Sequence, residues 1–108
     1  MINDLVTTEV LTFIAGNQLG RAGHYRYAAG CTEPTLYASS YAAMARHLLG
    51  DLQSLPAAER AAWVAYLQAH QDEDGLFRAP VIVDQGWYAG DPLWCGRPHL
   101  TCHVITAL

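Results

Sequence analysis

The sequence contains no lysine and few charged residues of any kind. Asp, Glu, Lys and Arg together make up 15% of the 108 residues, against about a quarter in a typical soluble domain. All six basic residues are arginines, they are dispersed along the chain, and the formal net charge is −4. Nucleic acids and anionic membranes are bound by clustered positive charge, so the composition argues against both as partners.

Long apolar runs and a dense cysteine framework are also missing. The N-terminal apolar stretch is interrupted by Glu9 and has no basic leader, so it matches neither a signal peptide nor a membrane span. Three cysteines without dense spacing are typical of reduced thiols. We therefore expect a cytoplasmic protein with no transmembrane segment.

Several motifs that identify an enzyme class are absent as well. The sequence has no Gly-rich phosphate loop, no Gly-x-Ser-x-Gly and no His-Glu-x-x-His. It does have 52% hydrophobic residues, which suits a globular interior. The informative features are therefore the order and spacing of its residues.

One residue pattern occurs twice, 53 positions apart. An aromatic and an aliphatic residue are followed by Gln, then Gly, then a second aromatic residue. The two copies are Phe13-Ile14…Gln18…Gly23-x-Tyr25 and Tyr66-Leu67…Gln71…Gly75-x-Phe77. A second landmark follows each copy, with Cys, Pro and Leu at the same spacing: Cys31-x-x-Pro34-x-Leu36 and Cys95-x-x-Pro98-x-Leu100. Two landmarks in the same order indicate an internal repeat of roughly 50–60 residues.

Hydrophobic periodicity predicts helices in each copy. We expect helices over 4–18, 34–49 and 56–71 and another from Pro98 onward, with a long loop over 72–97. The second of these is apolar or small nearly all round, which predicts a buried helix, whereas the third is amphipathic. The first repeat spans about 4–50 and the second about 54–108. The chain ends inside the second repeat, so we expect one partial domain over 1–108 that packs against further repeats of the same chain.

The doubled pattern resembles the QW-type repeat of the prenyltransferase and squalene/terpene cyclase superfamily. The string Gln71-Asp72-Glu73-Asp74-Gly75-Leu76-Phe77 is also similar to the Gln-x-x-Asp-Gly-Gly-Phe variants of protein prenyltransferase beta subunits. The resemblance implies an all-α fold, an α/α toroid in which outer helices alternate with inner helices that surround a central cavity. It further implies an apolar, isoprenoid-type ligand and, if the protein is an enzyme, a transferase or isomerase. The Gln and the final aromatic residue tie repeat to repeat in that family.

Acidic residues lie inside the second copy of the pattern. Class II terpene cyclases protonate their substrate with an Asp-x-Asp-Asp motif, and Asp72 and Asp74 are candidates for such an acid. The fourth position of the motif is occupied by Gly75. An exposed acidic turn after a helix is therefore the better explanation.

A zinc site is a second candidate. His99 and His103 are four residues apart and share a face of the expected helix, and Cys95 lies just before it. Trp94-Cys95-Gly96 resembles part of the Trp-Cys-x-Gly motif of lanthionine cyclases, which are α/α toroids that hold zinc through two Cys and one His. The alternative is that these are hydrogen-bonded groups at the start of a buried helix.

Aromatic residues suggest a ligand pocket. The candidate lining residues are Trp87, Tyr88 and Trp94 in the long loop, with His99 and Tyr41 on the inner helices. Such aromatics suit an apolar small molecule, although they also pack loops onto helices.

Other functions remain open from the sequence. Aromatic residues also stack on saccharides, and in a carbohydrate-active toroid Glu33 and Asp91 would be the candidate carboxylates. A zinc-dependent, lanthionine-cyclase-like toroid and a non-catalytic repeat scaffold are further alternatives.

Overall fold

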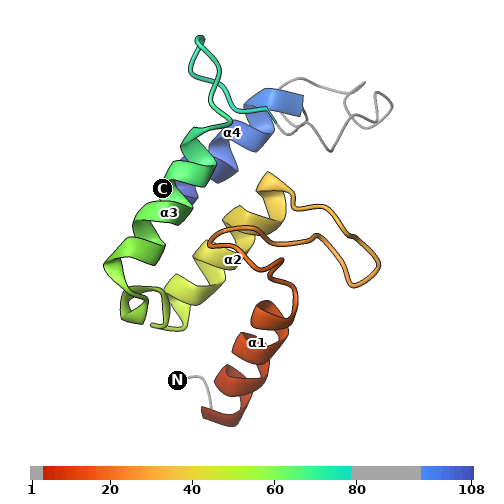
Figure 1. The fold of residues 1–108 in the computed structure, drawn as a ribbon, viewed down its shortest axis with the longest axis vertical. Coiled ribbons are helices and arrows are strands. Elements are labelled where there is room, and N and C mark those ends of the chain that lie inside the picture. The colour runs from red at the N-terminus through yellow and green to blue at the C-terminus, as the bar shows by residue number, and fades with distance from the viewer. Residues whose placement is uncertain (1–3, 79–95) are drawn as a thin grey trace.

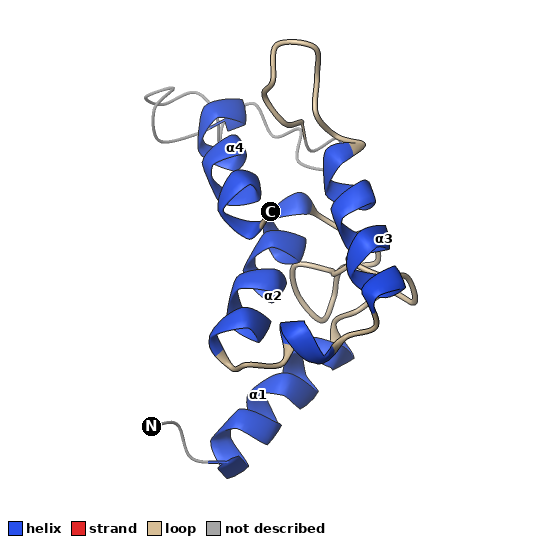
Figure 2. Cartoon of the chain, turned by 90° about the vertical axis from the view of Figure 1, so that its left-hand side faces the viewer, coloured by secondary structure: helices blue, strands red, loops and turns tan. Residues whose placement is uncertain are grey.

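A computed structural model describes residues 4–78 and 96–108 of the chain. Within these ranges the secondary structure is helical, and the all-α prediction is confirmed. The helices are α1 (Asp4–Gly16), α2 (Leu36–Leu48), α3 (Ala57–Gln68) and α4 (Gly96–Ala107), with a short 3-10 turn, η1 (Leu52–Ser54). Helices α2 and α4 pack against each other. Helix α3 runs beside them, and α1 lies at the opposite end of the molecule from the turn that follows α3 (Figure 1; Figure 2).

The helix boundaries differ from the predicted ones by up to three residues, for local reasons. Helix α2 begins at Leu36 rather than at Pro34, because the Thr35 side chain caps it by accepting a hydrogen bond from the N–H of Ala38 (3.1 Å). Helix α4 begins at Gly96, so Pro98 lies within its first turn. Most of the predicted loop, residues 79–95, lies outside the described residues.

Helices α1 and α3 end earlier than predicted because the repeated Gln leaves the helix. Gln18 forms an antiparallel bridge with Tyr25, and Gln71 forms the same bridge with Phe77. Each Gln side-chain amide donates a hydrogen bond to a carbonyl of its own turn, Arg21 O in the first copy and Gly75 O in the second, both at 3.0 Å. Both glutamines thus have a structural role, but their side chains close their own turns, whereas the family resemblance implied a tie between repeats.

The aromatic residue that ends each turn enters the core. Tyr25 and Phe77 are almost fully buried, together with Leu36, Trp63, Leu67, Leu100 and Val104. The first turn also fits closely against α3, because Gly23 has a φ of +79° and a Cβ there would lie 2.5 Å from Cδ1 of Trp63. Glycine is required at this position both by the backbone conformation and by the approach of the indole.

Two buried hydrogen bonds connect these elements. The indole N–H of Trp63 donates to Oγ of Ser39 (2.8 Å), joining α3 to α2. The backbone N–H of Phe77 donates to Oγ1 of Thr101 (2.9 Å), joining the second turn to α4. Because these polar groups are buried, losing one partner of either bond would leave the other without its hydrogen bond. Helix α3 and its turn are therefore anchored to both α2 and α4.

Helix α2 is buried as predicted over its first eight residues, but its C-terminal end is exposed at His47 and Leu48. Of its first eight residues, Tyr41 is the one that is exposed, and Ser39 and Ser40 have no exposed surface. Helix α1 differs, because none of its residues is buried. None of the helices in the described ranges is both long enough and apolar enough to cross a lipid bilayer.

Candidate functional site

Four aromatic rings from α2 and α4 meet in what we call the ring cluster: Tyr37, Tyr41, His99 and His103. On each helix the two members are four residues apart and so lie on one face. The ring centroids of Tyr37 and His99 are 5.7 Å apart, and those of Tyr41 and His103 are 5.3 Å apart. The pairing of α2 with α4 thus places the two tyrosines opposite the two histidines.

Hydrogen bonds fix the orientation of both imidazoles. The hydroxyl of Tyr37 lies 2.6 Å from Nδ1 of His99. Nδ1 of His103 lies 2.9 Å from the backbone carbonyl oxygen of His99. A carbonyl oxygen only accepts, so Nδ1 of His103 carries the proton and its Nε2 carries the lone pair when the ring is neutral.

The ring cluster has a buried base and an open rim. Tyr37 is buried, whereas Tyr41 is 46% exposed and both histidines are half-buried. A ligand can therefore reach the edges of Tyr41, His99 and His103, while Tyr37 holds His99 from behind.

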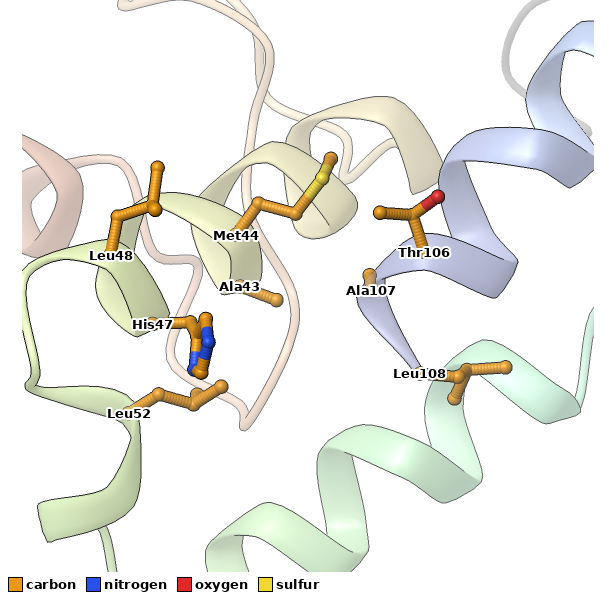
Figure 3. A pocket seen from close by; sticks show the side chains of 8 residues that line it. All are labelled: Ala43, Met44, His47, Leu48, Leu52, Thr106, Ala107 and Leu108. Atoms are coloured by element: carbon orange, nitrogen blue, oxygen red, sulfur yellow. The ribbon is translucent and has the colours of Figure 1, made fainter.

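An apolar pocket continues the same face toward the C-terminal ends of α2 and α4. Its volume is about 450 Å³, within the range of small-molecule sites. Met44 is three residues beyond Tyr41 on α2, and Thr106 is three residues beyond His103 on α4. Figure 3 shows the side chains of α2, η1 and the end of α4 around this pocket, which we call the terminal pocket. Most of its lining is aliphatic: Ala43, Met44, Leu48, Leu52, Ala107 and Leu108.

The acidic turn is separate from this face and is held by arginine. Arg97 donates hydrogen bonds to Oδ2 of Asp72 (2.6 Å) and to both carboxylate oxygens of Asp74 (2.9 and 3.1 Å). The hydrogen bonds from Arg97 lower the pKa of Asp74 below its ordinary value. A general acid must keep its proton, so this environment supports the structural interpretation of Asp72 and Asp74.

The other predicted site residues are placed as follows. Glu33 is exposed in the segment before α2. Asp91, Trp87, Tyr88, Trp94 and Cys95 lie outside the described residues. Of the predicted ligand-pocket and metal residues, the structure therefore brings together Tyr41, His99 and His103. Within residues 4–78 and 96–108, no three His, Cys, Asp or Glu side chains come close enough together to hold a metal ion.

Sequence reasoning did not identify two side-chain contacts near the predicted site residues. The hydrogen bond of Tyr37 to His99 was missed, although the spacing of Tyr37 and Tyr41 gives the signal that they share a face. The clamp of Arg97 on the acidic turn was also missed. It joins groups 23 and 25 residues apart, and no local pattern in the sequence indicates it.

The described residues therefore present a ring cluster next to an apolar pocket. Searches against protein-family models, curated proteins and solved structures give no match for this chain. What the site binds is accordingly argued from its own residues.

Proposed function

We propose that the chain forms helical repeats of an α/α toroid of the prenyltransferase/terpene cyclase type and binds an apolar, isoprenoid-type ligand. The doubled Gln–Gly–aromatic turn, the buried α2 and the amphipathic α3 support the toroid part of this proposal. In such an arrangement α2 and α4 are neighbouring inner helices, and α1 and α3 are outer helices. The free face of α2 and α4 then lines the central cavity.

The observation that carries the ligand class is the mostly aliphatic lining of the terminal pocket, which lies one helical turn beyond the ring cluster on α2 and α4. An aliphatic pocket with aromatic rings nearby on the same two helices fits a chain of branched isoprene units better than it fits a sugar. Sugar sites need several polar groups that point inward. In the described part of the terminal pocket, the polar side chains are His47 and Thr106.

The rings also suit the chemistry of isoprenoid substrates. The faces of tyrosine rings attract positive charge, and such stabilisation strengthens where water is excluded. The resemblance to prenyltransferases and terpene cyclases extends the proposal to a transferase or isomerase that acts on the bound chain. Asp74 is ion-paired and exposed, so the proposal assigns it no part in the reaction.

Titration with farnesol, a neutral C15 isoprenoid alcohol, tests the proposal directly. We expect saturable binding by isothermal titration calorimetry. Leu48→Gln should weaken it roughly tenfold, because burying a leucine side chain against an apolar ligand contributes about 1.5–3 kcal/mol when complete. Leu48 is 79% exposed in the free protein, so the substitution leaves the core intact.

Ile105→Gln is the matched control. Ile105 is a similarly large apolar residue on α4, 59% exposed, and it does not line the terminal pocket. This variant should bind farnesol like the wild type. Equal weakening by both substitutions, or wild-type binding to an oligosaccharide but not to farnesol, would reject the isoprenoid proposal.

A further inference from the structure

We infer that His99 and His103 form a two-imidazole site for a transition-metal dication of the Ni²⁺, Cu²⁺ and Zn²⁺ class. The site uses the open rim of the ring cluster and does not depend on the isoprenoid proposal. It also differs from the zinc site predicted from the sequence, because Cys95 is not needed as a third protein ligand.

The spacing and packing of the two histidines bring their rings together. They are four residues apart on α4, and their ring centroids are 4.5 Å apart. Two imidazoles on successive turns of a helix can bind one ion, with water completing its coordination. Both rings are half-buried, so water and ions reach them.

The hydrogen bond made by Nδ1 of His103 leaves its Nε2 able to bind a metal ion. Its Nδ1–H donates to the carbonyl oxygen of His99, so its Nε2 presents a lone pair. Metal-binding histidines commonly donate the other ring N–H in this way, which fixes the tautomer and the ring orientation.

The contact with Tyr37 serves the same purpose for His99. When Nδ1 of His99 carries the proton, it donates to the Tyr37 hydroxyl oxygen at 2.6 Å, and Nε2 is again the free nitrogen. Both imidazoles can thus present Nε2 to one ion while Nδ1 is held by the protein.

The type of donor determines the class of ion. Imidazole nitrogen suits Ni²⁺, Cu²⁺ and Zn²⁺, whereas Mg²⁺ and Ca²⁺ prefer oxygen ligands. With no carboxylate joined to the pair within the described residues, the site should discriminate against Mg²⁺ and Ca²⁺.

Calorimetric titration of the metal-free chain with Ni²⁺ tests this site, with thiols kept reduced. The expected result is one equivalent of bound Ni²⁺, no binding of Mg²⁺ at the same concentration, and loss of Ni²⁺ binding in both His99→Ala and His103→Ala. The matched control is His70→Ala. His70 makes the same local hydrogen bond, from Nδ1 to the carbonyl oxygen of Tyr66 four residues before it (2.8 Å), but its ring contact is with Tyr66 rather than with a second histidine.

A second measurement does not require the variants to fold. Because Ni²⁺ is paramagnetic when bound by few imidazoles, substoichiometric Ni²⁺ should broaden the imidazole NMR signals of His99 and His103 in the wild-type chain. The rings of His24, His47 and His70 should broaden later. The proposal is overturned if the wild type does not bind Ni²⁺, if His70→Ala loses binding equally, or if the other histidines broaden first. The same variants titrated with farnesol report separately on the isoprenoid proposal.

Discussion

Helices α1 and α3 occupy equivalent positions in the two repeats, yet they are buried very differently. In α3, Trp63 and Leu67 are buried in the core. In α1, Ile14 is partly buried, and Phe13, the repeat counterpart of Tyr66, is 72% exposed. The same motif thus produces the same turn in both copies but not the same burial of the helix before it.

The difference follows from what each helix lies against. Helix α3 is joined to α2 through Trp63 and to α4 through the turn at Phe77. Helix α1 instead borders an apolar groove of about 490 Å³ against α2, which Val10 and Phe13 line from one side and Tyr41 and Ala45 from the other. An apolar stripe therefore shows which face of a helix can be buried. Whether that face is buried depends on the neighbouring helices.

The largest effect expected from this comparison is on the stability contributed by the two helices. Trp63→Ala should lower the free energy of unfolding by about 3–5 kcal/mol, because it leaves a cavity and removes the hydrogen bond to buried Ser39. Phe13→Ala should change it by no more than about 0.5 kcal/mol, as expected for an exposed side chain. Urea denaturation followed by circular dichroism measures both. A large loss in Phe13→Ala would show that the exposed face of α1 is covered in solution.

A smaller difference in stability is expected between alanine substitutions at the glycines of the two turns. Gly23 and Gly75 both have positive φ, +79° and +87°, so alanine should cost about 1–2 kcal/mol at either position. At Gly23 the added Cβ also meets the Trp63 ring, whereas at Gly75 the nearest atom is 4.0 Å away. Gly23→Ala should therefore destabilise the chain by about 1–3 kcal/mol more than Gly75→Ala.

The glycine contrast is measured by comparing urea midpoints of the two variants. Trp63→Phe in the Gly23→Ala background provides the control, because a smaller ring relieves the contact and should reduce the extra loss. Equal costs at both glycines would mean that the Trp63 ring moves aside freely.

The turns could be predicted from the sequence because each of their residues has a local role. Gln closes the turn, Gly provides the positive φ, and the aromatic residue enters the core, so spacing alone identified Gln18, Gly23 and Tyr25. The exposure of α1 could not be predicted, because it depends on packing between helices. Its apolar spacing is the same kind of signal that correctly indicated the buried stripe of α3.

The candidate site was predictable only in part, for a related reason. The sequence indicated Tyr41, His99 and His103, since each lies on an expected inner helix. It did not reveal the pairing of Tyr37 with His99. These residues are 62 positions apart, and their contact depends on how α2 packs against α4, which the repeat spacing alone does not give. The Arg97 clamp also belongs to the second turn alone.

The smallest expected effect comes from the hydrogen bonds of Arg97 to Asp72 and Asp74. They should make the stability of the second turn, but not of the first, depend on pH. Hydrogen bonds from Arg97 lower the pKa of Asp74 in the folded chain below its ordinary value of 3.8. A lowered pKa stabilises the folded state above the ordinary value, and this contribution is lost as the pH falls through the lowered one. Asp74→Asn should therefore reduce the melting temperature slightly at about pH 6, and the difference from wild type should shrink toward about pH 3.

Glu73→Gln, which neutralises the neighbouring carboxylate in the same exposed turn, is the matched control for Asp74→Asn. Its difference from wild type should change less between these two pH values, because the clamp is made to Asp72 and Asp74. Arg97→Gln should abolish the pH-dependent difference between wild type and Asp74→Asn, since it removes the donor that lowers the pKa of Asp74. If Asp74→Asn still changes the pH dependence of the melting temperature in the Arg97→Gln background, that dependence does not come from Arg97. The second turn would then be held, like the first, by its backbone and its buried aromatic residue.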